Sequence, residues 1–243
     1  MNQTIAVLCF FLSSAFAHAT SAEHPFEVRQ TLVTQNPQEK IVALTLDACG
    51  GSFDADIIQY LTAQKIPATI FVTQRWMNKN PVAFAELKAR RDLFDIEDHG
   101  ARHVPAVVGP GRQVYGIAGS PDLEHLRQEV SGGAEAIEKS GGGKPRWYRG
   151  ATALYDVEAI NTIKKMGFRI AGFSVNADEG ATLSKRSIIA RLKAVKTGDI
   201  IIAHLNKPKS FSAEGLAEGI SWLGANGFRF VKLNQASVRE TPF

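Results

Sequence analysis

Cysteine is scarce in this chain of 243 residues, which contains only Cys9 and Cys49. Cys9 lies in an apolar N-terminal segment that we expect to be removed, which leaves Cys49 as the one cysteine of the remaining chain. An intramolecular disulfide is therefore excluded in that product, and its stability must come from the burial of apolar side chains. With 44% hydrophobic residues, a chain of this length can bury a substantial core.

Long apolar runs and clusters of basic residues are also missing. After the N-terminal segment no stretch is long and apolar enough to cross a membrane, so we expect no stable membrane insertion once that segment is gone. The formal charge is +4, but Lys and Arg are spread along the chain, so the pattern does not indicate nucleic-acid binding. A solvated basic surface is the favoured interpretation, and attraction to an anionic envelope polymer is the alternative. The pattern leaves the oligomeric state open.

The first residues have the features of a targeting segment. Residues 5–17 are apolar but too short to span a bilayer, and Ala15-Phe-Ala17 offers an A-x-A cleavage site, with a weaker site ending at Ala22. Because the segment lacks Lys and Arg, a retained membrane anchor is the alternative. We predict a signal peptide over residues 1–22, a polar lead-in over 23–40, and a periplasmic or secreted product.

From residue 41 to the end, apolar β-branched runs alternate with helical patterns. The runs predict strands at 41–46, 68–72, 93–97, 147–149, 168–175, 199–203 and 228–233. Helices are predicted between most of them, with Ser52, Asp156 and Ser212 as N-caps and Asn80-Pro81 as a cap followed by Pro at the first helical position. Ser120-Pro121 and Ser184 are further helix starts. This alternation indicates an α/β fold with a parallel sheet, either a closed β/α barrel or an open doubly wound sheet. No linker divides the pattern, so we predict one domain over 41–243.

Polar side chains follow the predicted strands at the points where the strands end. They are Asp47, His99, His103, Arg149, Asn176, Asp178 and His204. In a parallel barrel these ends converge on one face, so separate segments would deliver ionisable groups to one place. Burying an unpaired charge is costly, so separate structural reasons at each strand do not readily account for these polar side chains. We therefore expect a functional site at this face.

The segment His99-Gly-Ala-Arg-His103 is the candidate metal motif, because imidazoles at positions i and i+4 can meet one ion. It is not the protease motif H-E-x-x-H, since Gly100 occupies the Glu position. The glycine run at 141–143 lacks the Lys-Ser/Thr of a phosphate-binding loop, so we interpret it as a connector.

Taken in order, these segments resemble the five motifs of the polysaccharide deacetylase family, also called the NodB homology or carbohydrate esterase family 4 group. The family motifs are T-F-D-D, H-(S/T)-x-x-H, R-P-P-(Y/F), D-x-x-D-W and L-x-H. The matching segments are Thr45-Leu-Asp-Ala48, His99-Gly-Ala-Arg-His103, Arg149-Gly-Ala-Thr152, Asn176-Ala-Asp-Glu179-Gly180 and Ile202-Ala-His204. The resemblance covers about residues 41–233 and implies a distorted parallel β/α barrel of about seven strands.

The resemblance implies catalytic roles for the matched residues. Asp47 resembles the general base that takes a proton from the attacking water, and Arg149 resembles the residue that holds this base in place. His204 resembles the general acid that protonates the departing amine. The backbone N–H near Thr152 would help to bind the oxyanion. A carboxylate and an imidazole that divide the proton transfers suit the hydrolysis of an acetamide.

The resemblance also implies a divalent metal, with zinc favoured and cobalt or nickel as alternatives. His99 and His103 resemble two of its ligands. The second Asp of the first motif is a ligand in the family, but here it is Ala48, whose methyl group cannot coordinate. Two imidazoles alone make a weak site. Asp47 could move onto the metal, or Cys49 could supply a thiolate, although a small buried thiol is the favoured interpretation of Cys49.

In the fourth motif Asn176 replaces the first Asp, so the tuning of His204 passes to Asp178 or Glu179. The chain thus resembles a divergent member of the family. The predicted function is an exported metal-dependent hydrolase, acting on carbon–nitrogen bonds, that removes N-acetyl groups from an acetylated polysaccharide or oligosaccharide. The alternatives are a non-catalytic carbohydrate-binding protein on the same scaffold and an O-acetyl esterase.

Overall fold

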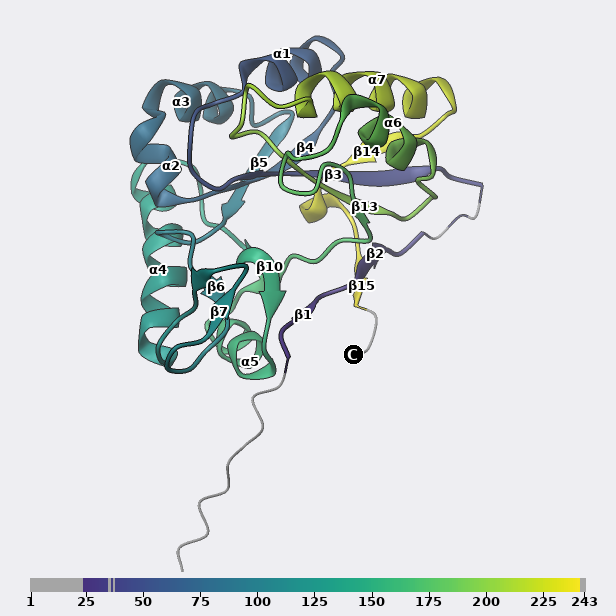
Figure 1. Ribbon diagram of the computed structural model, residues 1–243. Coiled ribbons are helices and arrows are strands. Elements are labelled where there is room, and N and C mark those ends of the chain that lie inside the picture. Colours follow the sequence, from purple (N-terminus) through teal and green to yellow (C-terminus); the bar gives the residue numbers. More distant parts are fainter. Residues whose placement is uncertain (1–23, 35, 37, 241–243) are drawn as a thin grey trace, which may run out of the picture.

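The computed structural model describes residues 24–34, 36 and 38–240, which form one body around a parallel sheet (Figure 1). The sheet contains eight strands: β3 (Ile41–Ala48), β4 (Ala68–Val72), β5 (Phe94–Asp98), β9 (Trp147–Tyr148), β11 (Arg169–Ile170), β12 (Val175–Asn176), β13 (Ile200–His204) and β14 (Arg229–Val231). Its path runs β11-β9-β5-β4-β3-β13-β12, and β14 pairs with β3. Every pairing in the sheet is parallel.

One extended segment joins the two edges of this sheet. β11 pairs with β9 at one edge, and β12 pairs with β13 at the other. Between them the backbone N–H of Ala171 still donates to the carbonyl of Tyr148. The strand predicted at 168–175 is therefore found as two short strands, and between them the carbonyl of Phe173 accepts the N–H of Gln30. The predicted distorted parallel β/α barrel in a single domain is confirmed.

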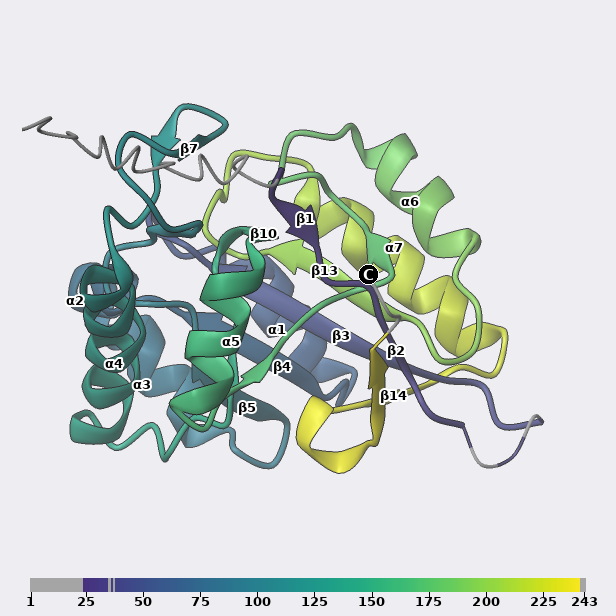
Figure 2. The same ribbon diagram turned by 90° about the horizontal axis from the view of Figure 1, so that it is seen from below.

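Helices cover the outside of the barrel except on the side where the lead-in runs (Figures 1 and 2). Among the described residues they are α1 (Ala55–Ala63), α2 (Gln74–Lys79), α3 (Pro81–Ala89), α4 (Leu123–Lys139), α5 (Val157–Lys165), α6 (Lys185–Lys193) and α7 (Ser212–Ala225). The largest apolar cluster packs the outer face of β3, β4 and β13 against α1, α2, α3, α6 and α7. A smaller cluster fills the barrel interior, and a third lies under α4 and α5.

Strand β3 shows how the sequence divides its side chains between these clusters. All eight of its residues are buried, as expected for a parallel strand that is covered on both faces. Val42, Leu44 and Leu46 belong to the outer cluster, together with Ala48. Successive strand residues point to opposite faces. Position 47 therefore directs its carboxylate to the inner side of the barrel. This alternation decides which side chains at the strand ends can meet.

The helix starts agree with the prediction at two caps and differ at others. Asp156 caps α5 through its side chain and Asn80 is the N-cap of α3, both as predicted. Ser184, predicted as the first residue of its helix, caps α6. The N-cap of α1 is Asp54 rather than Ser52, and the N-cap of α4 is Asp122, which follows Ser120-Pro121. Ser212 lies inside α7, after the N-cap Phe211. α2 was not predicted.

Short strands complete the body outside the barrel. β1 (Phe26–Glu27) pairs with β10 (Ala151–Tyr155), which also pairs with β6 (Pro105–Ala106). β2 (Gln30–Leu32) pairs with β15 (Val238–Glu240), and β7 (Gln113–Val114) forms a hairpin with β8 (Ile117–Ala118). The sequence predicted none of these. The lead-in is thus paired with the rest of the chain from residue 26 onward.

The predicted signal peptide, residues 1–22, lies outside the described residues. Within the described part of the chain, none of the helices has the length and apolar character that a membrane crossing needs.

Candidate active site

A cavity of about 700 Å³ opens at the carboxyl ends of the barrel strands. The predicted site residues that line it are Asp47, Cys49, His99, His103, Thr152 and His204. Arg149 and Asp178 lie behind this lining, and both are fully buried. The structure therefore brings together the residues that the sequence placed at separate strand ends.

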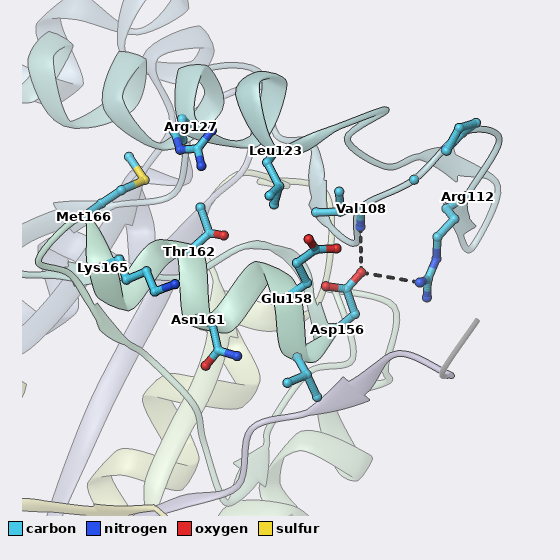
Figure 3. A pocket seen from close by; sticks show the side chains of 13 residues that line it. Val108, Arg112, Leu123, Arg127, Asp156, Glu158, Asn161, Thr162, Lys165 and Met166 are labelled. Atoms are coloured by element: carbon cyan, nitrogen blue, oxygen red, sulfur yellow. Dashed lines mark hydrogen bonds and ion pairs between the residues drawn. The ribbon is translucent and has the colours of Figure 1, made fainter. Parts of the chain in front are cut away.

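A second depression, of about 1060 Å³, lies between α4 and α5 (Figure 3). Its most buried charged group, Asp156, accepts the backbone N–H of Val108 at 2.6 Å and forms an ion pair with Arg112 at 3.4 Å. No predicted site residue lines this depression. We therefore take the cavity at the strand ends as the candidate site.

Asp47 and Arg149 form a buried ion pair at the base of this cavity. Nη1 of Arg149 donates to Oδ1 of Asp47 at 2.8 Å and to the hydroxyl of Thr45 at 2.9 Å. The rest of the guanidinium donates to the carbonyls of Ala171 and Gly172, each at 3.2 Å. Burial raises the pKa of Asp47, but Arg149 and two nearby imidazoles outweigh it and hold this pKa below its usual value. The carboxylate is therefore ionised and fixed in orientation.

His99 follows β5 and is held by one of its ring nitrogens. Its Nδ1 lies 2.6 Å from the carbonyl oxygen of Arg149, which can only accept, so Nδ1 carries a proton and donates it. The other nitrogen, Nε2, lies 3.4 Å from Sγ of Cys49 and 3.8 Å from Oδ2 of Asp47. Burial lowers the pKa of His99, but Asp47 and Cys49 outweigh it and raise this pKa to about 9. Because Nδ1 is bonded to the carbonyl of Arg149, His99 presents Nε2 to the cavity.

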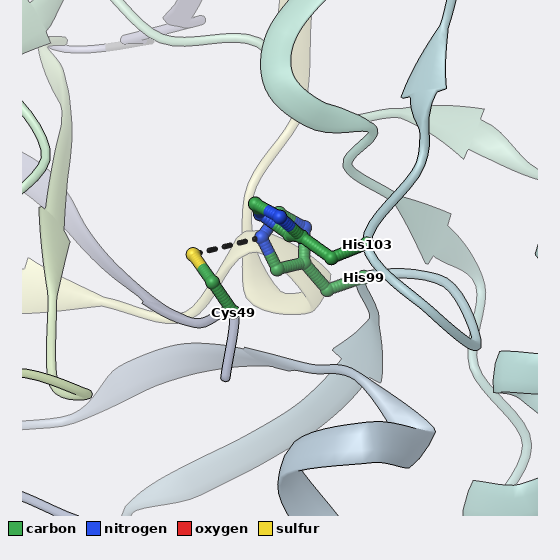
Figure 4. A group of neighbouring side chains, drawn as sticks. All are labelled: Cys49, His99 and His103. Atoms are coloured by element: carbon green, nitrogen blue, oxygen red, sulfur yellow. Dashed lines mark hydrogen bonds between the residues drawn. The ribbon is translucent and has the colours of Figure 1, made fainter. Parts of the chain in front are cut away.

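His103 completes a cluster with His99 and Cys49. One ligand atom from each of the three side chains lies within 4.8 Å of the other two. Figure 4 shows the side chains turned toward one another, the thiol from the end of β3 and the imidazoles from the loop after β5. Burial raises the pKa of the Cys49 thiol, but His99, His103 and His204 outweigh it and lower this pKa well below its usual value. A thiolate and two imidazoles are a donor set that fits zinc.

Glu129 of α4 holds the loop that carries both imidazoles, and the sequence did not predict this role. Its buried carboxylate accepts the backbone N–H of Arg102 at 2.9 Å and that of Val104 at 3.0 Å. Its backbone carbonyl accepts the N–H of Ala101. A Cβ at Gly100 would lie 2.4 Å from Oε1 of Glu129, so the carboxylate occupies the space that a side chain at Gly100 would need. Glu129 thus fixes the loop between the two histidines.

Replacing Glu129 by Ala should lower the free energy of unfolding by about 2–4 kcal/mol, because two backbone N–H groups lose their buried acceptor. Glu129→Gln keeps one carbonyl oxygen and should cost roughly half as much. Urea denaturation measures both. The control is Glu135→Ala on the same helix, whose exposed ion pair with Lys139 should contribute little to the free energy of unfolding. Equal effects at the two positions would contradict the role given to Glu129.

His204 ends β13 beside Asp47 in the strand register and is held from behind by Asp178. Oδ1 of Asp178 accepts Nδ1–H of His204 at 2.8 Å, and its Oδ2 accepts the backbone N–H of His204 and the hydroxyl of Ser212. Burial lowers the pKa of His204, but Asp178 and Cys49 outweigh it and raise this pKa well above its usual value. Glu179, the other residue considered for this contact, pairs with Arg191 instead. The helix start Ser212 thus uses its hydroxyl for the site rather than as a cap.

Thr152 lies at the cavity in a strained backbone. Thr152 and Ala153 have φ angles of +66° and +54°, in the left-handed region that non-glycine residues rarely adopt. They form the irregularity in β10 where its register with β6 shifts. The Ala153 N–H donates to the carbonyl of Gly150, and the Gly150 N–H donates to the Tyr155 hydroxyl at 2.8 Å. This turn brings the Thr152 backbone to the cavity wall.

A parallel β/α barrel with a paired carboxylate, a paired imidazole and a thiol–imidazole cluster at its strand ends has the groups of a catalytic site at the position where such barrels carry their active sites. The family model described as polysaccharide deacetylase matches residues 34–171. The chain therefore belongs to the polysaccharide deacetylase family.

Relatives of known name support this assignment. A bifunctional xylanase/deacetylase of Pseudobutyrivibrio xylanivorans is 21% identical over 202 residues, which cover 83% of this chain and 31% of that protein. The chain thus spans about a third of the length of this curated relative. A CE4 family pseudoenzyme from Bacillus anthracis has a TM-score of 0.67 at 18% identity, covering 82% of this chain and 66% of that one. The peptidoglycan deacetylase of Bacillus subtilis has a TM-score of 0.65 at 21% identity, covering 82% and 91%. These structural likenesses show a shared fold.

Proposed function

We propose that this chain is an exported hydrolase that removes N-acetyl groups from an acetylated carbohydrate polymer or oligomer, with the help of a divalent metal, zinc being favoured. One observation carries the proposal. Asp47 and His204 are direct neighbours in the β3–β13 register and line one cavity, and each has its own buried partner, Arg149 and Asp178. A carbohydrate-binding protein would have no need for a fixed base beside a fixed acid.

In the proposed reaction a water molecule adds to the acetyl carbon, the carbon–nitrogen bond breaks, and acetate and a free amine leave. Asp47 accepts the proton of the water, and Arg149 keeps its carboxylate ionised and oriented. His204, oriented by Asp178, gives a proton to the departing nitrogen. The backbone N–H of Thr152 donates to the oxyanion that forms on the acetyl oxygen.

His99 and His103 would hold the metal, together with Cys49 or Asp47. The donor chemistry fits, because the two imidazoles and the thiol already face one another within 4.8 Å. When bound, a metal supplies polarisation of the acetyl carbonyl and a lower pKa for a coordinated water.

The substrate proposal rests on the names of the relatives. One relative is a peptidoglycan deacetylase and another is a bifunctional xylanase/deacetylase. N-acetylated envelope sugars and chitooligosaccharides are therefore the first substrates to test. The test is acetate release from peptidoglycan, from chitooligosaccharides and from O-acetylated xylan, with and without added zinc. Acetate released from both would support amide hydrolysis. Release only from O-acetylated xylan would favour the esterase, which uses the same residues.

A non-catalytic carbohydrate-binding protein is the second candidate, and Ala48 is the observation that favours it. A methyl group replaces the carboxylate ligand of the family motif, and the B. anthracis relative is a pseudoenzyme. In that case chitooligosaccharides would bind, with heat measurable by calorimetry, but no acetate would appear under any metal condition. Acetate release by the zinc-loaded protein would exclude this candidate.

Export is the part of the proposal that rests on residues 1–22. The A-x-A site at Ala15–Ala17 and the second site at Ala22 predict that the mature chain starts within a few residues of His18 or Glu23. Intact-mass analysis of the protein recovered from the periplasm or the medium measures this start. A product that retains Met1 would contradict the predicted signal peptide.

A further inference from the structure

The side chain at position 48 faces away from the candidate metal cluster. Ala48 is fully buried in the outer apolar cluster, with Val72 and Trp76 among its members, and it does not line the cavity. Because strand residues alternate between faces, a carboxylate at position 48 would enter this apolar layer between the sheet and the helices. Ala48 therefore offers no ligand atom, and its methyl group packs on the side of the sheet away from the cavity.

The next residue has left the strand and faces the imidazoles instead. β3 ends at Ala48, and Cys49 lines the cavity with Sγ at 3.4 Å from Nε2 of His99. In a tetrahedral zinc site, sulfur and nitrogen ligands at ordinary bond lengths are about 3.5 Å apart. The observed separation already has this value. The other separations in the cluster are at most 4.8 Å, so closing it around one ion needs a movement of about 1 Å.

The orientation of the two possible third ligands separates them. Oδ1 of Asp47 accepts from Arg149, and this bond holds the carboxylate at the base of the cavity. Oδ2 of Asp47 lies 3.8 Å from Nε2 of His99, farther than Sγ of Cys49 at 3.4 Å. The group of potential ligand atoms found among the described residues contains Cys49, His99 and His103, without Asp47. Nδ1 of His99 is occupied by the carbonyl of Arg149, which directs Nε2 toward the thiol.

We infer that Cys49 is the third protein ligand of the metal, so that this chain has a thiolate–imidazole–imidazole centre where its family motif specifies a carboxylate and two imidazoles. The inference rests on the metal dependence in the proposed function and specifies its ligand set. It leaves Asp47 available as the base, and it leaves a fourth position for water or substrate. A thiolate favours zinc over the harder magnesium and calcium ions.

Zinc protection of the thiol tests the inference. In a Cys9→Ala background Cys49 is the only thiol, so alkylation by iodoacetamide, read by intact mass, reports on Cys49 alone. Zinc at a hundred times its dissociation constant should slow alkylation about a hundredfold, because only about 1% of the sites remain free. The same zinc concentration should protect much less in His103→Ala. The matched control His125→Ala, on the exposed face of α4, should keep full protection.

Cobalt provides a second readout that does not depend on activity. Cobalt bound to the wild-type protein should give a sulfur-to-metal charge-transfer band in the near ultraviolet. Cys49→Asp should still bind cobalt, through an oxygen, but without this band. Ala48→Asp should keep the band, because Cys49 still supplies the sulfur, and its melting temperature should fall, because a carboxylate replaces a methyl group that is buried in the apolar cluster.

The outcomes separate the two proposals. If calorimetry shows zinc binding but Cys49 is alkylated equally fast with and without zinc, the thiolate assignment is wrong and the proposed function stands. Cobalt binding without the charge-transfer band leads to the same conclusion. If the wild-type protein binds neither metal, the metal dependence of the proposed function fails.

Discussion

Asp47→Asn is expected to lower kcat for acetate release by about a hundredfold or more, and His204→Ala should have an effect of similar size. Asp47 is the one ionised carboxylate on the cavity floor that is aligned by a buried guanidinium. The amide of Asn can still accept the bond from Arg149 but cannot take a proton from water. His204 is the imidazole that Asp178 orients from behind, and its loss removes the donor to the departing amine.

The two variants should remain folded, which circular dichroism can check. Asp47→Asn should nevertheless be less stable in urea than the wild type, because it leaves the buried Arg149 without its counter-charge. His204→Ala offers an additional test, because added imidazole should recover part of its activity if the missing group is a proton donor. The control is His125→Ala, an exposed imidazole on α4 that is remote from the cavity and should leave kcat unchanged. Activity near the wild-type level in either site variant would mean that the site has been assigned wrongly.

The barrel could be predicted because its long strands are covered on both faces. β3, β4 and β13 are continuous apolar runs in the sequence, and their predicted and observed bounds differ by no more than two residues. The short strands could not be predicted, because tertiary contacts define them. β10 contains two residues with left-handed φ angles, and between β11 and β12 the backbone of Phe173 bonds to the lead-in instead of continuing the strand. No local pattern in the sequence encodes either event.

The convergence of Asp47, His99, His103 and His204 followed from one rule, that parallel strands bring their carboxyl ends to one face. Glu129 escaped this rule because it lies within a helix, 25 residues or more from the loop it holds. A signal was present, since Glu129 falls three residues after Leu126 on the stripe of α4 that is buried. A carboxylate on an apolar stripe needs a buried partner, which here is the backbone of the loop.

The placement of Cys49 shows a limit of motif comparison. The family motif aligns a ligand with position 48, whereas the pleat of β3 turns that position outward. Only the structure reveals that the strand has ended by position 49 and that this side chain faces His99. At the end of this strand, two consecutive side chains thus have different surroundings: Ala48 packs in the apolar cluster, and Cys49 lines the cavity.

The largest expected effect on stability belongs to Arg149→Met. The guanidinium is fully buried, donates to Asp47, Thr45 and two carbonyl oxygens, and lies 4.3 Å from the ring centroid of Phe71. Met has a similar length and fills much of the same space, so the change mainly removes the charge and the donors. Removing one partner of a buried ion pair leaves the other uncompensated, which costs about 3–5 kcal/mol. Urea denaturation should show a loss of this size.

The double variant Asp47→Asn/Arg149→Met separates the charge from the other contacts. With the carboxylate neutralised, no unpaired charge remains, so the double variant should be more stable than Arg149→Met alone. The free energy of unfolding that the double variant does not recover measures the other contacts of Arg149, which are its bonds to the carbonyls of Ala171 and Gly172 and its stacking on Phe71. A coupling energy above about 1 kcal/mol in this cycle would show that Arg149 acts through Asp47. Purely additive effects would mean that Arg149 stabilises the barrel independently, and His99 and His204 would then be the groups that hold Asp47 ionised.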